Sequence, residues 1–398
     1  MDQIDELLTR GVEKIYPSRA ALEKVLRSGK KLRLYQGFDP SMPNLHLGNL
    51  VGVLKLKEFQ DLGHEVIFMV GDFTGMIGDP TEKASVRPRL TRKQVLDNSK
   101  SWKNQAGRIL KFTGSNAAKM EFNSRWNDKI TFKDLIEFSA NFTVQQMIER
   151  DFFQKRLKED KPIFLHEFLY PLAQAIDSVK MNVDLEIGGN DQTFNMLCGR
   201  TLMRAISGKE KFVLATKLLV NSQGNKVGKT TGNALFLNAT PEDMYGGIMS
   251  FPDEVIVPGF ELLTQVPINL IQEISISVTT GDVNPMKFKK QLAFEIVKML
   301  YSERKAQAAE NRFERVFQKR ELPAMISAYP VKKGELLVDI LAKSGLALSK
   351  SEAKRLISQG SVKIQDSVIK DRQLRLTDKH HQSVLKVGKR RFLKLEIN

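Results

Sequence analysis

The sequence predicts an α/β protein that is built on a parallel β-sheet and continues into a helical region and a small basic module. Three observations lead to this prediction. Short apolar segments at 32–37 and 66–70 are typical of strands, and a glycine-bearing turn follows each of them. An amphipathic helix is expected between them, which gives the strand–helix–strand pattern of a parallel sheet. Ligands of such sheets bind beyond the carboxyl ends of the strands.

The composition is that of a soluble globular protein, with 398 residues of which 41% are apolar. This length suits two or three domains. No apolar run is long enough to span a membrane and the first residues lack a signal-peptide pattern, so no membrane partner is expected. Cys198 is the single cysteine, which excludes a disulfide framework and a multi-cysteine zinc site. A reducing, cytoplasmic location fits best.

Positive charge is concentrated toward the C-terminal end. The net charge is +16, and residues 331–398 hold 16 Lys and Arg residues against 7 Asp and Glu residues. More than half of the excess therefore lies in about a sixth of the chain. This asymmetry indicates a polyanionic partner, and nucleic acid is the first candidate. An anionic membrane fits less well, because the region lacks a long helix with one apolar face.

In chain order, residues 1–30 are expected to be helical and to lead into the first strand. The stretch 35–49, YQGFDPSMPNLHLGN, ends that strand at Gly37, turns through two prolines and opens a helix at His46. A histidine and a glycine at a helix N-terminus suit phosphate binding, because unpaired N–H groups and the positive helix end attract an anion. The alternative is that His46 only caps the helix.

The region from about 130 to 165 is also expected to be helical. Aromatic and apolar positions recur along it, as they do in a core helix. Their number exceeds what one helix face needs, so the surplus leaves room for a subunit interface. Core packing and an interface are both open at this point.

A helix with polar groups on one face comes next. Pro171 suits its first turn, and Tyr170, Gln174 and Asp177 then recur at spacings of four and three residues. Three polar groups on an otherwise apolar helix suit a small polar ligand. The following predicted strand ends in GGNDQ, in which Asp191 is placed to bind the hydroxyl groups of a ribose.

A second basic motif, GNKVGKT, occupies residues 224–230. Lys226 and Lys229 flank Gly228 and could close as a cationic clamp over a triphosphate, while a solvated basic loop is the alternative. The motifs HLGN and KVGKT, in this order and with strands and helices alternating between them, resemble the two signatures of the class I aminoacyl-tRNA synthetases.

The pattern after this loop is helical as far as about Arg320, and a linker is expected around 323–334. The unit after the linker begins with a short apolar helix. A second helix there has a capped start, with Ser349 at the cap and Glu352 three residues later. Short strands follow to the end of the chain.

The segment SKSEAKRLISQGSVKI in this last unit resembles the alpha-L RNA-binding module, a compact helix–helix–strand fold of ribosomal proteins and RNA-modifying enzymes. The match covers most of residues 333–395. The resemblance implies that the RNA-facing residues are Lys350, Lys354, Arg355 and Lys363. The alternative is a basic, solvated cap.

Taken whole, the chain resembles the bacterial-type tyrosyl-tRNA synthetases, because YxGFDP, HLGN, GDFTGMIGDP, YPLAQAIDS, IGGNDQ and KVGKT occur in that family's order. The resemblance implies a Rossmann-like parallel-sheet catalytic domain at 1–231, with a helical interface insertion at about 125–165. An α-helical anticodon-side domain at 232–325 and a small α+β RNA-binding module at 333–398 follow. It also implies a homodimer that makes tyrosyl-adenylate and pyrophosphate from L-tyrosine and ATP, and then transfers tyrosine to the 3′ end of tRNA(Tyr).

The resemblance further implies roles for residues at positions that match the family's motifs. Those expected to bind tyrosine are Tyr35 and Asp177 at the phenolic hydroxyl, Asp79, Tyr170 and Gln174 at the amino group, and Gln192 in the same pocket. Those expected to bind ATP are Gly37, Asp39, Ser41, His46, Gly48, Gly189, Asp191 and Lys229. The catalytic positions, at the reacting and departing phosphates, are His46, Asn49, Lys226, Lys229 and Thr230.

The chemistry that the resemblance implies needs no protein nucleophile. The tyrosine carboxylate attacks the α-phosphorus itself, so catalysis consists of positioning and of stabilising charge. Mg²⁺ is expected with ATP as a substrate complex, and no tightly bound metal ion is expected. The resemblance is incomplete in three places. Asn49 stands where the family often has a second histidine and is expected to alter the rate, and Glu186 stands where some members carry glutamine, with no role assigned. KVGKT lacks the Met-Ser centre of the class signature, a variation that tyrosyl enzymes tolerate.

Three other functions compete with this interpretation. A tryptophanyl-tRNA synthetase shares the catalytic fold, but indole has no hydroxyl for Tyr35 and Asp177 to bind. A non-catalytic RNA-binding or splicing protein on the same scaffold would not need His46 and Lys226, although such proteins can keep them. A small adenylyltransferase with an HxGH motif would have no use for the C-terminal RNA module.

Overall fold

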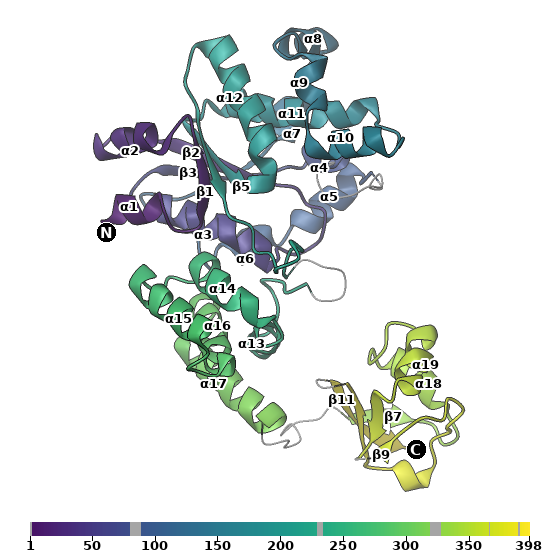
Figure 1. The fold of residues 1–398 in the computed structure, drawn as a ribbon. Helices are drawn as coiled ribbons and strands as arrows, with labels where there is room; N and C mark the ends of the chain where they lie inside the picture. Colours follow the sequence, from purple (N-terminus) through teal and green to yellow (C-terminus); the bar gives the residue numbers. More distant parts are fainter. Residues whose placement is uncertain (1, 80–88, 229–233, 319–327, 366, 389–390) are drawn as a thin grey trace. The chain divides into compact units, whose positions relative to one another are not determined.

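The computed structural model describes residues 2–79, 89–228, 234–318, 328–365, 367–388 and 391–398. The chain divides into two units, Met1–Ala309 and Glu310–Asn398, which we describe separately. Figure 1 shows the first unit with its sheet between layers of helices, and the second as a small sheet with two helices.

A six-stranded sheet organises the first unit, with the order β1-β6-β5-β2-β3-β4 among the described strands. Its members are β1 (Val12–Tyr16), β2 (Arg33–Phe38), β3 (Glu65–Val70), β4 (Lys119–Phe122), β5 (Leu185–Gly189) and β6 (Phe212–Thr216). All neighbouring pairs are parallel except β1 with β6. Strand β2 lies at the centre of the sheet, with β3 on one side of it and β5 on the other. The connections therefore run in opposite directions from this point. The carboxyl ends of β2 and β5 form the switch point at which α/β sheets bind ligands.

The prediction that residues 1–30 are helical was wrong in its middle part. Helices α1 (Gln3–Leu7) and α2 (Arg19–Arg27) are present, but β1 lies between them and pairs antiparallel with β6. Strand β1 buries Ile15 opposite Leu214 while its charged residues face outward. Five residues give too short an alternating pattern to stand out between two helices, and an antiparallel edge strand makes this sheet mixed rather than wholly parallel.

Helices cover both faces of the sheet (Figure 1). On one face, α3 (Leu47–Asp61) buries Leu50, Val53 and Leu56, and α6 (Trp102–Ala106) lies beside it. On the other face, α11 (Leu165–Met181) packs along α12 (Thr193–Ser207). Both strands flanking α3 confirm the strand–helix–strand prediction.

Helix α11 begins earlier than predicted. Its first residue is Leu165, so Pro171 lies inside the helix rather than in its first turn. Proline has no N–H to donate to the carbonyl of Glu167, but the rest of the helix is held by its buried face. The preceding region is helical as expected, in three short pieces: α8 (Phe132–Ser139), α9 (Val144–Ile148) and α10 (Asp151–Lys158).

The remaining helices of the first unit form two groups, one beside the sheet and one that follows the basic loop in the sequence. Those near the sheet are α4 (Thr74–Ile77), α5 (Arg92–Ser99) and α7 (Ser124–Asn127). Those after the basic loop are α13 (Pro241–Ile248), η3 (Asp253–Val255), α14 (Ile256–Leu263), α15 (Ile268–Thr280), α16 (Pro285–Leu300) and α17 (Glu303–Phe313), whose residues from Glu310 onward belong to the second unit. The predicted helical region is therefore confirmed, and a π-helical turn, Glu314–Gln318, continues from α17 in the second unit.

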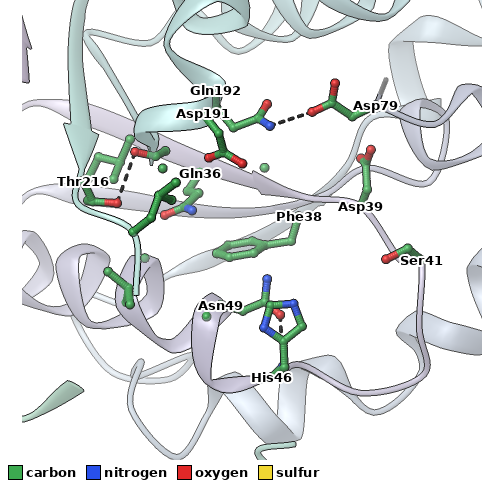
Figure 2. A pocket seen from close by; sticks show the side chains of 18 of the residues that line it. Gln36, Phe38, Asp39, Ser41, His46, Asn49, Asp79, Asp191, Gln192 and Thr216 are labelled. Atoms are coloured by element: carbon green, nitrogen blue, oxygen red, sulfur yellow. Dashed lines mark hydrogen bonds between the residues drawn. The ribbon is translucent and has the colours of Figure 1, made fainter. Parts of the chain in front are cut away.

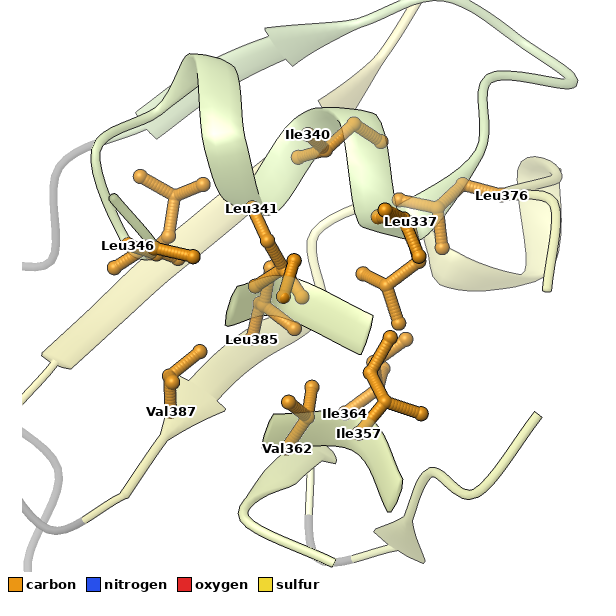
Figure 3. Packing of buried hydrophobic residues seen from close by; sticks show 14 of the residues in the cluster. Leu337, Ile340, Leu341, Leu346, Ile357, Val362, Ile364, Leu376, Leu385 and Val387 are labelled. Carbon is orange, nitrogen blue, oxygen red and sulfur yellow. The ribbon is translucent and has the colours of Figure 1, made fainter. Parts of the chain in front are cut away.

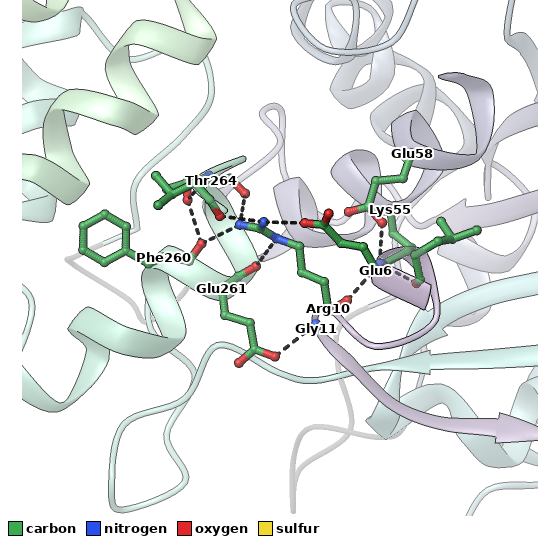
Figure 4. A network of polar contacts seen from close by, with 10 residues as sticks. Glu6, Arg10, Gly11, Lys55, Glu58, Phe260, Glu261 and Thr264 are labelled. Carbon is green, nitrogen blue, oxygen red and sulfur yellow. Dashed lines mark hydrogen bonds and ion pairs between the residues drawn. The ribbon is translucent and has the colours of Figure 1, made fainter. Parts of the chain in front are cut away.

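One arginine makes several of the contacts that join this helical region to the rest of the first unit. The buried guanidinium of Arg10, just after α1, donates to backbone oxygens at the end of α14 and beyond it (Figure 4). The acceptors are the carbonyl oxygens of Phe260 (3.1 Å), Glu261 (3.1 Å), Thr264 (2.6 Å) and Val266 (2.7 Å). The last carbonyls of a helix have no partner within the helix, so Arg10 caps α14 from another segment.

The second unit is an α+β module around a five-stranded sheet with the order β7-β11-β10-β8-β9 among the described strands. Its elements are β7 (Ala328–Val331), α18 (Leu337–Lys343), α19 (Lys350–Ser358), β8 (Val362–Ile364), β9 (Ser367–Val368), η5 (Asp378–His380), β10 (Val384–Val387) and β11 (Arg391–Ile397). Leu341, Ile357 and Leu385, among others, pack into one apolar core (Figure 3). Ser349 Oγ accepts from the Glu352 N–H at 3.1 Å, which confirms the predicted cap.

The linker that was expected at 323–334 is wrong from Ala328 onward, because β7 begins there and pairs with β11. The first residues of the expected linker lie outside the described part of the chain.

The capping of α14 by Arg10 predicts a large loss of stability when this side chain is replaced. Arg10→Met leaves four carbonyl oxygens without their charged donor, and we expect the free energy of unfolding to fall by about 2–4 kcal/mol, measured by urea denaturation. Arg27→Met removes an exposed arginine with ion pairs to Asp2 and Glu23, so it should change stability by less than about 1 kcal/mol. Equal losses in the two variants would contradict the capping role.

Candidate functional site

A pocket opens at the carboxyl ends of β2 and β5, where the sheet's connections reverse (Figure 2). The structure brings most of the predicted site residues together in its lining. The predicted residues found there are Gly37, Asp39, Ser41, His46, Gly48, Asn49, Asp79, Tyr170, Gln174, Asp177, Gly189, Asp191, Gln192 and Lys226. Lys229 and Thr230 lie outside the described residues. Tyr35 is described, but it is not among the residues that line the pocket.

The N-terminus of α3 forms the floor of the pocket. His46 is the N-cap residue, and the adjoining Leu47 N–H donates to the Leu235 carbonyl at 2.9 Å, which fixes where the helix begins. Asn49 Oδ1 accepts from the His46 N–H at 3.0 Å. Figure 2 shows the amide nitrogen of Asn49 turned toward the pocket. Asn49 therefore both completes the cap of the helix and leaves a donor facing the ligand space.

Asp39 at the end of β2 receives two hydroxyl donors. Thr74 Oγ1 lies 2.6 Å from one carboxylate oxygen, and the Tyr170 hydroxyl lies 2.7 Å from the other. Burial, followed by the charge of Asp39, raises the pKa of Tyr170 well above its ordinary value, so this hydroxyl stays protonated. The resemblance assigned Asp39 to the nucleotide and Tyr170 to the amino group of the amino acid, and the structure brings their side chains into contact.

Asp79 is held by residues from two other segments. Gln192 Nε2 donates to one oxygen at 2.6 Å, and Arg150 Nη2 lies 3.4 Å from the other. The Arg150 guanidinium also lies over the rings of Phe152 (4.3 Å) and Phe194 (5.2 Å). Burial lowers the pKa of Arg150 and Asp79 counteracts this. Sequence reasoning missed Arg150, because no motif contains it and it lies 71 positions from its partner.

Asp177 is the most deeply buried carboxyl group of the pocket, with none of its surface exposed. Three N–H groups converge on it: Trp126 Nε1 (2.7 Å), Asn127 Nδ2 (2.9 Å) and Asn123 Nδ2 (3.1 Å). Burial raises its pKa to about 8, even though these donors favour the charged form. Sequence reasoning missed all three donors, which come from the loop and short helix that follow β4.

Tyr35 lies behind the pocket wall, fully buried on β2. Its hydroxyl is 3.0 Å from Ser178 Oγ, and its ring packs against Ile67 and Met181. Burial, with the charges of Glu186 and Asp177, raises its pKa well above the ordinary value. Asp177 and Tyr35 thus lie close together, but only Asp177 lines the described pocket.

The basic loop reaches the pocket through its first lysine. Lys226 Nζ lies 2.7 Å from Asp191 Oδ2, which joins the clamp motif to the turn after β5. A cation and a carboxylate in contact at the pocket edge can bind a phosphate and a sugar hydroxyl, respectively, on one ligand. No cluster of three metal-ligating side chains occurs within the described ranges.

The predicted RNA-binding residues lie in the second unit. Lys350, Lys354 and Arg355 are exposed on α19, whereas Lys363 is half-buried on β8. Lys350 lies 2.8 Å from Asp339, and Arg355 lies 3.8 Å from Glu352. Such exposed pairs are weak, so a polyanion can displace them.

Comparison with known proteins agrees with this geometry. Residues 27–318 match the family described as tRNA synthetases class I (W and Y), and residues 327–380 match the S4 domain. The chain is therefore a class I aminoacyl-tRNA synthetase with an S4 RNA-binding domain. It is 43% identical to a tyrosine–tRNA ligase of Carboxydothermus hydrogenoformans, over 98% of this chain and 97% of that protein. It is 41% identical to that of Thermotoga maritima, over 98% of this chain and 96% of that protein.

Within that class, the chain belongs to the tyrosine–tRNA ligase family. Solved structures show the same fold at low identity. A truncated mitochondrial tyrosyl-tRNA synthetase of Aspergillus nidulans has a TM-score of 0.66 at 22% identity, over 79% of this chain and 94% of that one. The Archaeoglobus fulgidus enzyme complexed with L-tyrosine has a TM-score of 0.59 at 20% identity, over 78% of this chain and 100% of that one. In the described part of the chain, no helix is both long and apolar enough to cross a membrane.

The raised pKa of Asp177 predicts a dependence of stability on pH. Between about pH 4, the ordinary value for the unfolded chain, and about pH 8, the folded protein keeps a proton that the unfolded chain has released. This contribution to the free energy of unfolding is complete below about pH 4 and is lost as the pH rises to about 8. Asp177→Asn has no such proton. The difference between its free energy of unfolding and that of the wild type, measured by urea denaturation, should therefore shrink as the pH rises from 5 to 8. A deficit independent of pH would contradict this assignment.

Proposed function

We propose that this pocket joins L-tyrosine to ATP as tyrosyl-adenylate, releasing pyrophosphate, and then passes tyrosine to the 3′ end of tRNA(Tyr). The observation that carries the proposal is the division of one pocket into two ends. Carboxylates and amides of β5, the turn after β5, α11 and the turn after α4 surround one end, and the N-terminus of α3 with Lys226 faces the other. Membership of the tyrosine–tRNA ligase family supports the same reaction.

The first end suits an amino acid with a polar tip. Asp79, Tyr170, Gln174 and Gln192 surround the amino group, and Asp177 takes the phenolic hydroxyl, with Tyr35 close behind it. An ionised Asp177 accepts the phenolic hydrogen and a protonated one donates its own, so either form engages the hydroxyl. Phenylalanine would place a ring C–H where this buried carboxyl would otherwise bind the hydroxyl, and so would lose that hydrogen bond, an effect for which tyrosyl-tRNA synthetase is itself the standard example.

The second end suits ATP. Asp191 holds the ribose, and Gly37, Gly48 and Gly189 allow the nucleotide to approach the backbone. Asp39 and Ser41 lie along the path from the adenylate to the phosphates, where His46, Asn49 and Lys226 stabilise the charge that develops, and Lys229 and Thr230 complete the clamp. Mg²⁺ enters with ATP and balances the phosphate charge.

The second unit supplies binding to tRNA. Lys350, Lys354, Arg355 and Lys363 contact its phosphates, consistent with the +9 charge of residues 331–398 and with the S4 domain match.

The chain works as a homodimer through the helical insertion. Large apolar side chains are exposed there: Phe132 (78%), Ile136 (55%), Val144 (70%) and Leu165 (79%). Four exposed apolar side chains within one region are typical of a surface that a partner protein covers. We propose that a second copy of this chain covers it. A cytoplasmic location fits the buried thiol of Cys198.

The proposed activation step is tested by ATP–pyrophosphate exchange. We expect exchange with tyrosine and none above background with tryptophan or phenylalanine. Lys226→Ala should lower kcat by about 10²- to 10³-fold, because a cation at the reacting phosphates is lost. Lys100→Ala, at an exposed lysine of similar charge elsewhere, should leave kcat unchanged. Exchange with tryptophan, or a folded protein without any exchange, would contradict the proposal.

The RNA-binding role of α19 gives a separate prediction. Lys354→Glu should weaken tRNA binding and reduce its dependence on salt by about one phosphate contact, while tyrosine-dependent exchange stays unchanged. Lys24→Glu on α2 makes the same change of net charge in the first unit and should leave tRNA affinity as it is. Equal weakening in both variants would show a general effect of charge rather than a contact on α19.

A further inference from the structure

A buried ion pair lies directly behind the tyrosine end of the pocket. Glu186 on β5 and Lys211, one residue before β6, have 1% and 0% of their surface exposed and are in direct contact. Glu186 lines the pocket, while Lys211 lies behind it. Two opposite charges buried this deeply at the edge of a binding pocket need a structural explanation.

Glu186 is the acceptor in each of its side-chain hydrogen bonds. Its Oε1 accepts from Gln174 Nε2 at 2.8 Å. Its Oε2 accepts from Lys211 and from Ser178 Oγ at 3.3 Å, and Lys211 also donates to Ser178 at 2.9 Å. A carboxylate only accepts hydrogen bonds, so Gln174 must turn its NH₂ group toward Glu186. The carbonyl oxygen of the Gln174 amide is then left for the other side, which is the pocket.

Helix α12 passes close to the pair, and its Gly199 has no side chain to collide with it. A Cβ atom on Gly199 would lie 2.5 Å from Lys211 Nζ and 2.7 Å from Ser178 Oγ, which is closer than real contacts allow. Burial lowers the pKa of Lys211, and the adjoining Glu186 counteracts that effect. A charge taken out of water at this depth is stable only with a close partner, so each member of the pair requires the other.

We propose that Glu186 and Lys211 are positioning residues that set the orientation of the Gln174 amide, so that its oxygen accepts an N–H of the substrate's amino group. The inference rests on the proposed function, which assigns Gln174 to that group. A glutamine at position 186 could not do this beside a lysine. Lys211 can only donate, so it would claim the amide oxygen and turn the amide nitrogen toward Gln174. Gln174 would then present its own NH₂ group to a cation.

The test is a pair of substitutions in which the second reverses the first. Glu186→Gln should raise the KM for tyrosine about tenfold, the effect of losing one charge-assisted hydrogen bond, and leave the KM for ATP unchanged. Adding Lys211→Met frees the amide oxygen of the new glutamine to accept from Gln174 again. The double variant should therefore return to within about threefold of the wild-type KM for tyrosine.

Matched controls separate positioning from stability. Lys55 and Glu58 form another ion pair with a buried lysine, on α3 and away from the pocket. Lys55→Met and Glu58→Gln should lower the melting temperature without moving either KM. If Glu186→Gln does not fold, the double variant Glu186→Leu with Lys211→Met, which buries no unpaired charge, provides the second measurement. It leaves Gln174 without an acceptor, so it should raise the KM for tyrosine by a similar factor, whereas Glu186→Gln with Lys211→Met should not.

Three results would overturn the inference: an unchanged tyrosine KM in Glu186→Gln, a parallel rise of both KM values, or a double variant no better than the single one. Wild-type protein without tyrosine-dependent exchange would instead overturn the proposed function. The two failures are therefore distinguishable in the same assay.

Discussion

A buried carboxylate needs hydrogen-bond donors, and the pocket depends on this constraint throughout. Asp39, Asp79, Asp177 and Glu186 each receive donors from a segment distant in the sequence. Burying Asp177 or Glu186 without its donors would cost several kcal/mol, on the order of half the total stability of the protein. The four carboxyl groups therefore have their donors before any substrate arrives. It fixes the lining of the pocket as firmly as apolar packing fixes a core.

The sequence predicted those parts of the structure in which a local pattern and a motif agree. Strand β2, the turn after it and helix α3 follow from hydrophobic periodicity and from the helix start at His46. The cap of α19 at Ser349 follows from the spacing of two side chains. In each case the atoms that make the contact are a few residues apart, so the sequence itself contains the geometry.

The rest depended on contacts that only the fold creates. Strand β1 is held by pairing with β6, some 200 residues later, and five residues are too few for a periodic signal. The donors to Asp177 and the partner of Glu186 lie in segments without a recognisable motif. The motif residues were placed at the pocket by resemblance, but the side chains that orient them came from the structure. Tyr35 shows the same limit, because its motif gave no sign that it lies behind the wall.

The contact of Arg10 with α14 has a consequence for how this protein can change over time. All four acceptors on the helical side are backbone oxygens, which every amino acid supplies. Substitutions along the end of α14 therefore leave the acceptors in place as long as the helix ends at the same residue. The surface of the helical region can therefore diversify toward new partners while the acceptors of Arg10 persist. At Glu261 the side chain itself accepts from the Gly11 N–H and pairs with Lys217, so at that position the attachment does depend on which residue is present.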